Sequence, residues 1–333
     1  MKPARTVKLP EVQQSYLGMY SINGSTTTVV WCLTDGKPGH ANQLRGLVSA
    51  LERRRDIDVH WLDVPSRWES FRDWITRRSS LGHALPRPKL ILAAGQATHA
   101  AALSVRRSRG GRVVLLMRPS LPANWFDLCL IPDHDLGERK GNNDDVHIVR
   151  TCGVLNSVQP ASTPDVQRGL FLIGGPSKHH DWDDSSIDSQ VREIVGASAE
   201  TQWTLTTSRR TPETFFPRLA GRSYSNITII PASETPTGWV EEQLTTAGTV
   251  FVTEDSVSMV YEALSANADV GLLHVPRRRT SRVIRGVDRL AESRVVIPFA
   301  EWMESQFKHR QPCVLQEADR CAGIVCSRLL DAA

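Results

Sequence analysis

The sequence predicts an α/β protein made of two domains, each built on an open sheet of parallel strands. Short apolar runs alternate with amphipathic helical patterns along the chain, and the alternation is interrupted once, around residues 151–168. Such alternation favours parallel strands joined by right-handed crossovers. The length of 333 residues exceeds one ordinary hydrophobic core. Two domains facing a cleft account for both observations.

Composition restricts the class of protein. Hydrophobic residues make up 40% of the chain and charged residues 23%, as in soluble globular proteins. The polar residues 1–28 lack the apolar centre of a secretory signal and predict a loosely held extension. A net charge of +4 gives no indication of nucleic-acid binding. We expect a cytoplasmic protein, with peripheral contact at the inner face of the plasma membrane as an option. The six cysteines form no C-x-x-C pair, so buried free thiols are expected.

The first half contains five predicted strands, at residues 28–34, 57–64, 89–95, 112–117 and 126–132. Two helical patterns follow the first two strands, and each is expected to bury one apolar stripe. The stripe residues are Leu44, Leu47, Val48 and Leu51 in one helix, and Trp68, Phe71 and Ile75 in the other. We assign residues 29–160 to this first Rossmann-like domain.

The second half repeats the pattern after a linker rich in Ser, Thr, Pro and Asn. Its predicted strands lie at residues 169–175, 201–208, 226–232, 249–255 and 270–276. We assign residues 161–310 to the second Rossmann-like domain and residues 311–333 to a terminal helix that packs back on the first. Ligands of such sheets bind beyond the carboxyl ends of the strands. The functional residues are therefore expected directly after the apolar runs.

The loop "TDGKPGH" after the first strand allows three interpretations: a phosphate cradle, a catalytic loop or a tight turn. They make different demands on Asp35, Lys37 and His40. A turn accounts for Gly36, Pro38 and Gly39 alone.

"GGPSKHHDW" follows the first strand of the second half. Gly174 and Gly175 can bring backbone amides close to a phosphate, and Ser177 and Lys178 can add a hydroxyl and a cation. A glycine-rich turn is the alternative. Because neither a Walker sequence nor G-x-G-x-x-G is present, a P-loop NTPase or a standard NAD site is not supported. The acidic and histidine residues 179–183 lack the spacing of a zinc site, so no metal is predicted.

Two further strand ends in this half suit phosphate. In "TTSRRTP", Thr206, Thr207 and Ser208 are placed to cap the next helix, and Arg209 and Arg210 can pair with phosphate; plain capping beside solvated arginines is the alternative. In "TEDSVSMVYEA", Ser256 at a helix start leaves first-turn amides for an anion. Glu262, inside that helix among apolar residues, suits the two hydroxyls of a ribose.

Together, "LTDGKPGHANQLRGL", "FDLCLIPDHD", "IGGPSKHHDWD", "TTSRRTP" and "VTEDSVSMVYEA" resemble the motifs of the mitochondrial fission ELM family. The resemblance runs from about residue 29 to about residue 300. Bacterial members of that family are described as predicted glycosyltransferases of the GT-B type. The resemblance implies a GT-B-like fold, in which two Rossmann-like domains face a central cleft. It also implies that the nucleotide-sugar donor binds to the second domain and the acceptor to the first.

The resemblance also implies roles for individual residues. Those expected around the donor diphosphate and ribose are Gly174, Gly175, Ser177, Lys178, Thr207, Ser208, Arg209, Ser256, Val257, Ser258 and Glu262. Those expected on the acceptor-side loops are Gly36, Lys37, Gly39, Asn42, Gln43, Gly95 and Gln96. The first loop also resembles the Gly-Gly-His loop of lipid II N-acetylglucosaminyltransferases. Family members often carry a small residue at the position of Glu254, which favours Glu262 as the ribose ligand.

These implications give a mechanism. His40, or Asp35, would take the proton of an acceptor hydroxyl, since imidazole titrates near neutral pH. Cations and helix-start amides would stabilise the leaving nucleoside diphosphate without a metal or another cofactor, and the single displacement would invert the sugar. The acceptor would be a glycan, a lipid or another hydroxyl compound, plausibly in cell-envelope synthesis. The alternatives are a nucleotide-sugar epimerase or hydrolase, and a non-catalytic scaffold.

Overall fold

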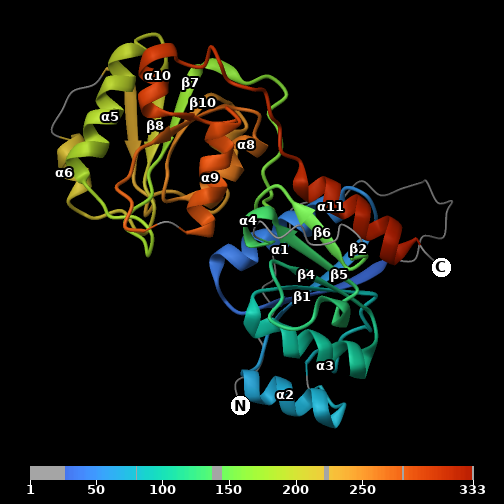
Figure 1. The fold of residues 1–333 in the computed structure, drawn as a ribbon. Helices are drawn as coiled ribbons and strands as arrows, with labels where there is room; N and C mark the ends of the chain where they lie inside the picture. Colours follow the sequence, from blue (N-terminus) through green and yellow to red (C-terminus); the bar gives the residue numbers. More distant parts are fainter. Residues whose placement is uncertain (1–26, 80, 137–144, 221–224, 280, 332–333) are drawn as a thin grey trace.

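The computed structural model describes residues 27–79, 81–136, 145–220, 225–279 and 281–331. Within these residues the chain forms two lobes, each built on one six-stranded sheet (Figure 1). Neighbouring strands are parallel throughout both sheets. The predicted fold class is confirmed.

The first sheet has the strand order β2-β1-β3-β4-β5-β6. The elements of this lobe are β1 (Thr28–Thr34), α1 (Pro38–Glu52), β2 (Ile57–Asp63), α2 (Arg67–Thr76), β3 (Leu90–Ala94), α3 (His99–Arg109), β4 (Arg112–Leu116), β5 (Leu128–Pro132), α4 (Asp133–Leu136) and β6 (Ile148–Thr151).

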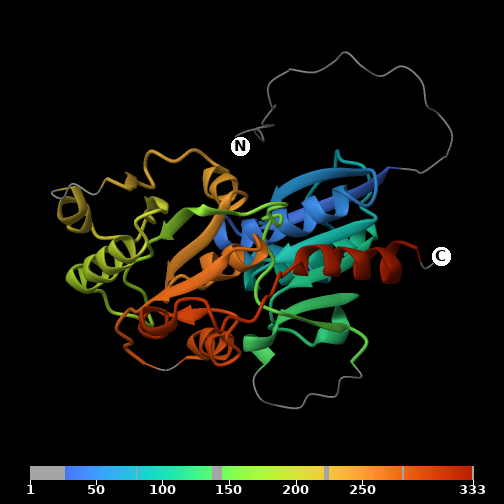
Figure 2. The ribbon, with the colours of Figure 1, turned by 90° about the horizontal axis from the view of Figure 1, so that it is seen from above.

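The second sheet has the order β12-β11-β10-β7-β8-β9. The elements here are β7 (Asp165–Leu172), α5 (Asp184–Ala197), β8 (Gln202–Thr206), α6 (Phe215–Ala220), β9 (Ile227–Ile230), α7 (Trp239–Leu244), β10 (Ala247–Thr253), α8 (Val257–Ser265), β11 (Asp269–Leu273), α9 (Arg282–Glu292), β12 (Ile297–Pro298) and α10 (Phe299–Ser305). The chain then returns to the first lobe as α11 (Glu317–Val325) (Figure 2).

Both faces of each sheet are covered, because successive side chains on a strand point to opposite faces. In β1, Val30 and Cys32 pack in the cluster that includes α1 and α11, whereas Trp31 and Leu33 pack in the cluster that includes α3. This two-sided burial explains why the strands are nearly continuous apolar runs.

Helix α11 completes the core of the first lobe. The connection from β4 to β5 holds a short 3₁₀ turn at Ala123–Trp125 and packs on the face that α3 covers. Cys321 and Val325 of α11 lie on the other face, beside α1, and join the cluster that holds Leu128 and Leu130 of β5.

Three details differ from the sequence-based expectations. Strand β7 begins at Asp165, inside the predicted linker, and the short strands β6 and β12 were not expected. A strand of two to four residues shows too little of any period to be recognised. The third difference lies in α2, whose apolar stripe of Trp68, Phe71 and Ile75 was expected to be buried and is exposed.

One further finding concerns membranes: among the described helices, none is long and apolar enough to span a bilayer.

The strand orders create one switch point in each sheet, where successive crossovers leave toward opposite faces and open a crevice. In the first sheet it lies between β1 and β3, and in the second between β7 and β10. The loops that begin at residues 35 and 95 therefore meet in one lobe, and those that begin at residues 173 and 254 meet in the other.

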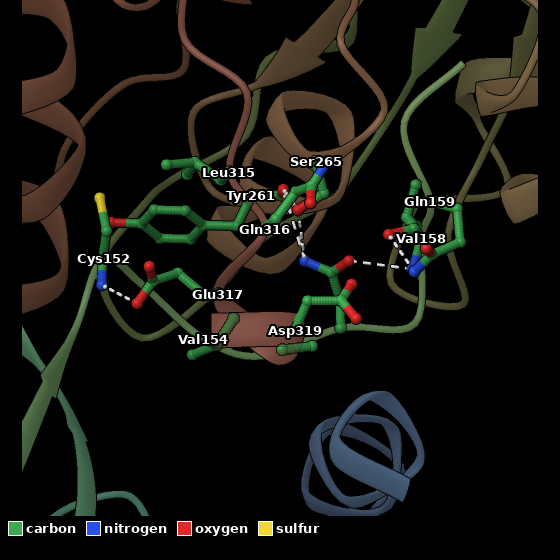
Figure 3. Close-up of a pocket in the computed structure, with 12 residues that line it drawn as sticks. Cys152, Val154, Val158, Gln159, Tyr261, Ser265, Leu315, Gln316, Glu317 and Asp319 are labelled. Carbon is green, nitrogen blue, oxygen red and sulfur yellow. Dashed lines mark hydrogen bonds between the residues drawn. The ribbon is translucent and has the colours of Figure 1, made fainter. Parts of the chain in front are cut away.

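The linker is held at the junction of the lobes (Figure 3). The side chain of Asn156 donates to the carbonyl oxygen of Tyr261 and to Ser265 of α8, at 3.4 and 3.0 Å. The amide of Cys152 donates to Glu317, at the start of α11, at 3.0 Å. The two segments that connect the lobes, the linker and the start of α11, are thus held by hydrogen bonds to α8 and to each other.

Gly46 of α1 supports this junction, and its replacement is a test of it. A Cβ on Gly46 would lie 2.5 Å from the backbone carbonyl of Asn156. For Gly46→Ala we expect a net loss of up to about 2 kcal/mol of unfolding free energy, because crowding against backbone atoms costs about 1–3 kcal/mol and the helix-propensity gain returns only about 1 kcal/mol. Gly196→Ala in α5 is the control, since its Cβ would meet no atom within 4 Å. Chemical denaturation compares the two; Gly46→Ala as stable as the native protein would contradict the close packing.

Candidate functional site

The first group of polar residues lies at the switch point of the first sheet. The Nδ1 atom of His40 is 2.9 Å from Oδ1 of Asp35, and Nζ of Lys37 is 3.4 Å from Oδ2. The side chain of Asp35 is only 5% exposed and that of His40 16%. The loop after β1 therefore brings an imidazole and a nearly buried carboxylate together.

Gly95, at the end of β3, makes room for this pair. Its φ is +91°, a conformation that glycine adopts without strain. A Cβ at this position would lie 2.4 Å from Nδ1 of His40 and 3.0 Å from the carboxylate of Asp35. The close approach of the two loops requires a residue without a side chain at this point.

The pair has the electrostatics of an oriented base. Burial alone would raise the pKa of Asp35, but the hydrogen bond with His40 and the positive charges of His40 and Lys37 outweigh it and lower this pKa below its ordinary value. The anionic carboxylate favours the tautomer of His40 that carries its proton on Nδ1. The other nitrogen, Nε2, is then an acceptor for a proton from a bound molecule.

His40 and Lys37 line a cavity of about 480 Å³ between the lobes. Gly95, Gln96 and Arg118 also line it from the first lobe, and Arg282 of α9 lines it from the second. The carbonyl oxygen of Asp135 accepts hydrogen bonds from Arg118 and Arg282, both at 3.3 Å. The cavity is thus rich in cations and has walls from both lobes.

The other residues expected on the acceptor side lie around this cavity without lining it. Gly36 turns the chain with φ +76° and lines a neighbouring hollow. Asn42 accepts a hydrogen bond from Arg45 at 2.9 Å, and Gln43 is buried in α1. A Cβ on Gly39 would meet no atom within 4 Å, so nothing in the packing requires glycine there.

The second group lies at the switch point of the second sheet and centres on Asp255. Its fully buried carboxylate accepts hydrogen bonds from Arg210 at 2.7 Å, from the amide of Gly175 at 3.0 Å and from the hydroxyl of Ser256 at 3.1 Å. Arg210 also donates to the carbonyl oxygen of Gly175 at 2.7 Å. Three strand ends, after β7, β8 and β10, thus converge on one carboxylate.

The two glycines of "GGPSKHH" are required for this convergence. A Cβ on Gly174 would lie 2.2 Å from the hydroxyl of Ser256, and one on Gly175 would lie 2.2 Å from the carbonyl oxygen of Arg210. Both glycine amides are engaged inside the protein, that of Gly174 with Thr253 at 2.8 Å and that of Gly175 with Asp255. A phosphate could use these amides only by replacing those bonds.

Some hydroxyls have other roles than the expected caps. Helix α6 begins only at Phe215, so Thr207 and Ser208 do not cap it. Instead, Thr207 accepts a hydrogen bond from the amide of Ala232 at 3.2 Å, and Ser208 accepts one from the amide of Arg210 at 3.2 Å. Ser256 occupies the N-cap position of α8 but uses its hydroxyl for Asp255 and Arg210.

The loop after β7 is closed by Ser177. Its hydroxyl accepts hydrogen bonds from the amides of His179 and His180, at 3.2 and 3.0 Å. Lys178 projects from this loop and is exposed, as are Arg209 and Ser258 on the neighbouring strand ends. In the described part of the chain, no group of three or more His, Cys, Asp or Glu residues is arranged to hold a metal ion.

The two glutamates near α8 have different environments. Glu254 is buried and lies 3.5 Å from both Arg277 and His274, on the side of β11. Burial, with a smaller contribution from the charge of Glu241, raises the pKa of Glu262 to about 8. Glu262 is therefore mostly protonated at neutral pH in the unliganded protein.

Sequence reasoning did not select the pair at the centre of the second group. It offered both Arg209 and Arg210 for phosphate and placed only Arg209 at the diphosphate, whereas the contacts with Gly175, Asp255 and Ser256 belong to Arg210. The sequence contained a signal for Arg210 and Asp255. Asp255 lies at the end of a predicted strand, and the loops at the switch point of a parallel sheet lie together, so Asp255 could have been expected beside the glycine loop.

The family comparison identifies the chain. The family model described as "Mitochondrial fission ELM1" matches residues 38–329. The chain belongs to this family. The match covers both lobes and α11, so the resemblance inferred from the motifs is confirmed.

Solved structures of nucleotide-sugar enzymes share the fold. A putative UDP-N-acetylglucosamine 2-epimerase from Listeria monocytogenes has a TM-score of 0.60 at 14% identity, over 92% of this chain and 98% of that one. The UDP-GlcNAc 2-epimerase from Neisseria meningitidis, bound to UDP-GlcNAc, has a TM-score of 0.54 at 12% identity, over 92% and 100%. The glycotransferase of kitacinnamycin has a TM-score of 0.52 at 12% identity, over 91% and 100%. At these identities the likeness establishes the GT-B-like fold alone.

Gly95→Ala tests whether the His40–Asp35 pair depends on a close approach of two loops. We expect it to lose more unfolding free energy than Gly110→Ala. Both glycines combine a φ between +84° and +91° with an extended ψ, a conformation that only glycine adopts readily, so both variants carry backbone strain of about 1–3 kcal/mol. Only the Cβ at residue 95 collides with His40, since none of the atoms around Gly110 lies within 4 Å. Denaturant unfolding measures the difference, and equal losses would show that the loops tolerate separation.

Glu262→Gln tests the raised pKa. Between pH 4.5, the ordinary pKa of a glutamate, and about pH 8, Glu262 is protonated in the folded protein and ionised in the unfolded chain. The contribution of Glu262 to the unfolding free energy therefore falls as pH rises through this range. We expect Glu262→Gln to melt at a higher temperature than the native protein at pH 8, with a smaller difference at pH 5. Glu242→Gln, exposed on the neighbouring helix α7, is the control. A difference between Glu262→Gln and the native protein that does not change with pH would contradict the assignment.

Proposed function

We propose that the protein is a glycosyltransferase that moves a sugar from a nucleotide-sugar to an acceptor hydroxyl. The observation that carries the proposal is the oriented His40–Asp35 pair, which lines the cavity between the two lobes of a GT-B-like fold. A base at this position suits an acceptor that enters from the first lobe while the second lobe holds the donor.

The first lobe supplies the base. The acceptor hydroxyl transfers its proton to Nε2 of His40 as its oxygen attacks the anomeric carbon of the sugar. Asp35 stabilises the imidazolium that forms, in the manner of an orienting carboxylate. The bond between that carbon and the diphosphate oxygen breaks, and the electron pair leaves with the nucleoside diphosphate. A single displacement of this kind inverts the anomeric centre.

The second lobe supplies the donor site. The exposed cations Lys178 and Arg209 and the first-turn amides of α8, at Val257 and Ser258, would stabilise the charge of the leaving diphosphate. Asp255 holds Arg210 and the glycine loop in position for this purpose. Glu262 would bind the ribose hydroxyls. UDP-sugars are the donors to test first, because the similar epimerase from Neisseria meningitidis was solved with UDP-GlcNAc.

A nucleotide-sugar epimerase is the second candidate, and the likeness to two such enzymes favours it. The two functions differ in their products. An epimerase changes the sugar of the donor in the absence of an acceptor, whereas a transferase releases the nucleoside diphosphate when an acceptor is present. Product analysis of each donor, incubated alone and with an acceptor extract, separates them.

The proposal predicts donor-specific stabilisation and a dependence on His40. A nucleotide-sugar at a hundredfold its Kd should raise the unfolding free energy by about 2.7 kcal/mol, and a thermal-shift screen of UDP, GDP, CMP and ADP sugars identifies it. With that donor, His40→Ala should lower turnover by about 100-fold or more and leave the donor-induced shift in place.

The matched control is His60→Ala. Nε2 of His60 lies 2.9 Å from Asp58 on β2, and neither residue lines the cavity between the lobes. Turnover should be unchanged in this variant. A screen in which none of the nucleotide-sugars shifts the melting temperature would contradict the proposed function.

A further inference from the structure

Helix α2 presents its apolar stripe outward. Trp68 is 82% exposed and Phe71 46%, whereas the polar Ser70 and Asp73 on the other side are buried. The helix lies outside α3, at the end of the first lobe that is remote from the second (Figure 1). Exposed apolar surface of this kind marks a binding face.

The exposed stripe forms one wall of an apolar groove of about 650 Å³. Its walls come from α2, α3 and the segment after β4, and its main apolar side chains are Trp68, Phe71, Trp74, Leu103, Leu121 and Trp125. The rings of Phe71 and Trp74 are 5.9 Å apart, and those of Trp74 and Trp125 are 6.0 Å apart. The groove is thus a preformed row of aromatic rings.

This groove is continuous with the cavity that His40 lines. Gln96 lines both. The segment 95–99 passes from the cavity, at Gly95, into the groove, at Ala97, and the segment 117–121 does the same between Pro119 and Ser120. A single molecule can therefore occupy both along two loops of the first lobe.

The two ends of this combined site differ in charge. At the cavity end, the lining includes the cations Lys37, Arg118 and Arg282 and one acidic residue, Asp135, while the carboxylate of Asp35 lies beside Lys37. At the groove end, the lining side chains are mainly aromatic and aliphatic. An anionic group suits the first end and a hydrocarbon chain suits the second.

We propose that the cavity and the groove form one site for an amphiphile, with its anionic headgroup in the cavity and its aliphatic chain against α2. If the proposed function holds, this amphiphile is the acceptor, and a hydroxyl of its headgroup lies beside His40. The substrate class is then a lipid carrier with an anionic head. The continuity of the groove with a cationic cavity favours this occupant over a second copy of the chain.

Decyl phosphate below its micellar concentration is the probe, and isothermal titration calorimetry is the measurement. We expect decyl phosphate to bind at least tenfold more tightly than inorganic phosphate and than the uncharged decyl maltoside. The double variant Trp68→Ala/Phe71→Ala should weaken binding of decyl phosphate at least tenfold and leave the affinity for inorganic phosphate unchanged. Arg118→Gln should weaken the binding of both phosphates.

Two variants serve as controls. Val166→Ala removes an apolar side chain that is 80% exposed on β7, and Arg168→Gln neutralises an exposed arginine on the same strand. Neither residue lines the combined site, so both variants should bind decyl phosphate as the native protein does. Melting temperatures within about 2–4 °C of the native value show that each variant is folded.

Three results would overturn the proposal. These are equal affinity for decyl maltoside and decyl phosphate, unchanged affinity in the α2 double variant, and a dimer in sedimentation that the same double variant dissociates. The proposed function is judged separately, because the donor-induced thermal shift involves the second lobe. Loss of that shift with decyl phosphate binding intact would refute the transferase and leave the amphiphile site standing.

Discussion

The reversal of strand order at the centre of each sheet is the constraint on which both candidate sites depend. At such a point the crossovers leave toward opposite faces, so the two adjacent loops diverge and leave a crevice between them. In the first lobe this brings Gly95 against His40 and Asp35. In the second it brings Gly175 against Asp255. The polar residues are thus assembled by topology, and the glycines are the positions where a neighbouring loop approaches too closely for a Cβ atom.

The two lobes are tied together by the chain itself. Helix α11 is last in the sequence, yet it completes the hydrophobic core of the first lobe, so the second lobe has both its ends attached to the first. The linker contacts of Asn156 and the bond from Cys152 to Glu317 lie side by side at the junction. A change in the angle between the lobes must rearrange this junction. It would also alter the contact of Arg282 with Asp135, which closes the cavity beside His40.

The fold was predictable because its central strands are buried on both faces and form continuous apolar runs, whose ends mark where polar loops begin. Side-chain partners were less predictable. The choice between Arg209 and Arg210 depends on which one faces Asp255, a residue far away in sequence, and no local pattern encodes it. The stripe of α2 shows the same limit in another form. Periodicity reveals that one face of a helix is apolar, but whether that face meets the core or the solvent depends on what packs beside it.

The two switch points differ in how they use a buried carboxylate. In the first lobe, Asp35 is paired with the imidazole of His40, which the proposed function uses as a base, so the charge of the pair would change during the reaction. In the second lobe, Asp255 is paired with a guanidinium that stays charged, so this pair is a permanent structural element. The free cations of the second lobe, Lys178 and Arg209, are exposed on the surrounding loops. The proposed function places proton transfer in the first lobe and fixed positive charge in the second, and this division suits a reaction in which a base and a leaving group act on opposite sides of one carbon.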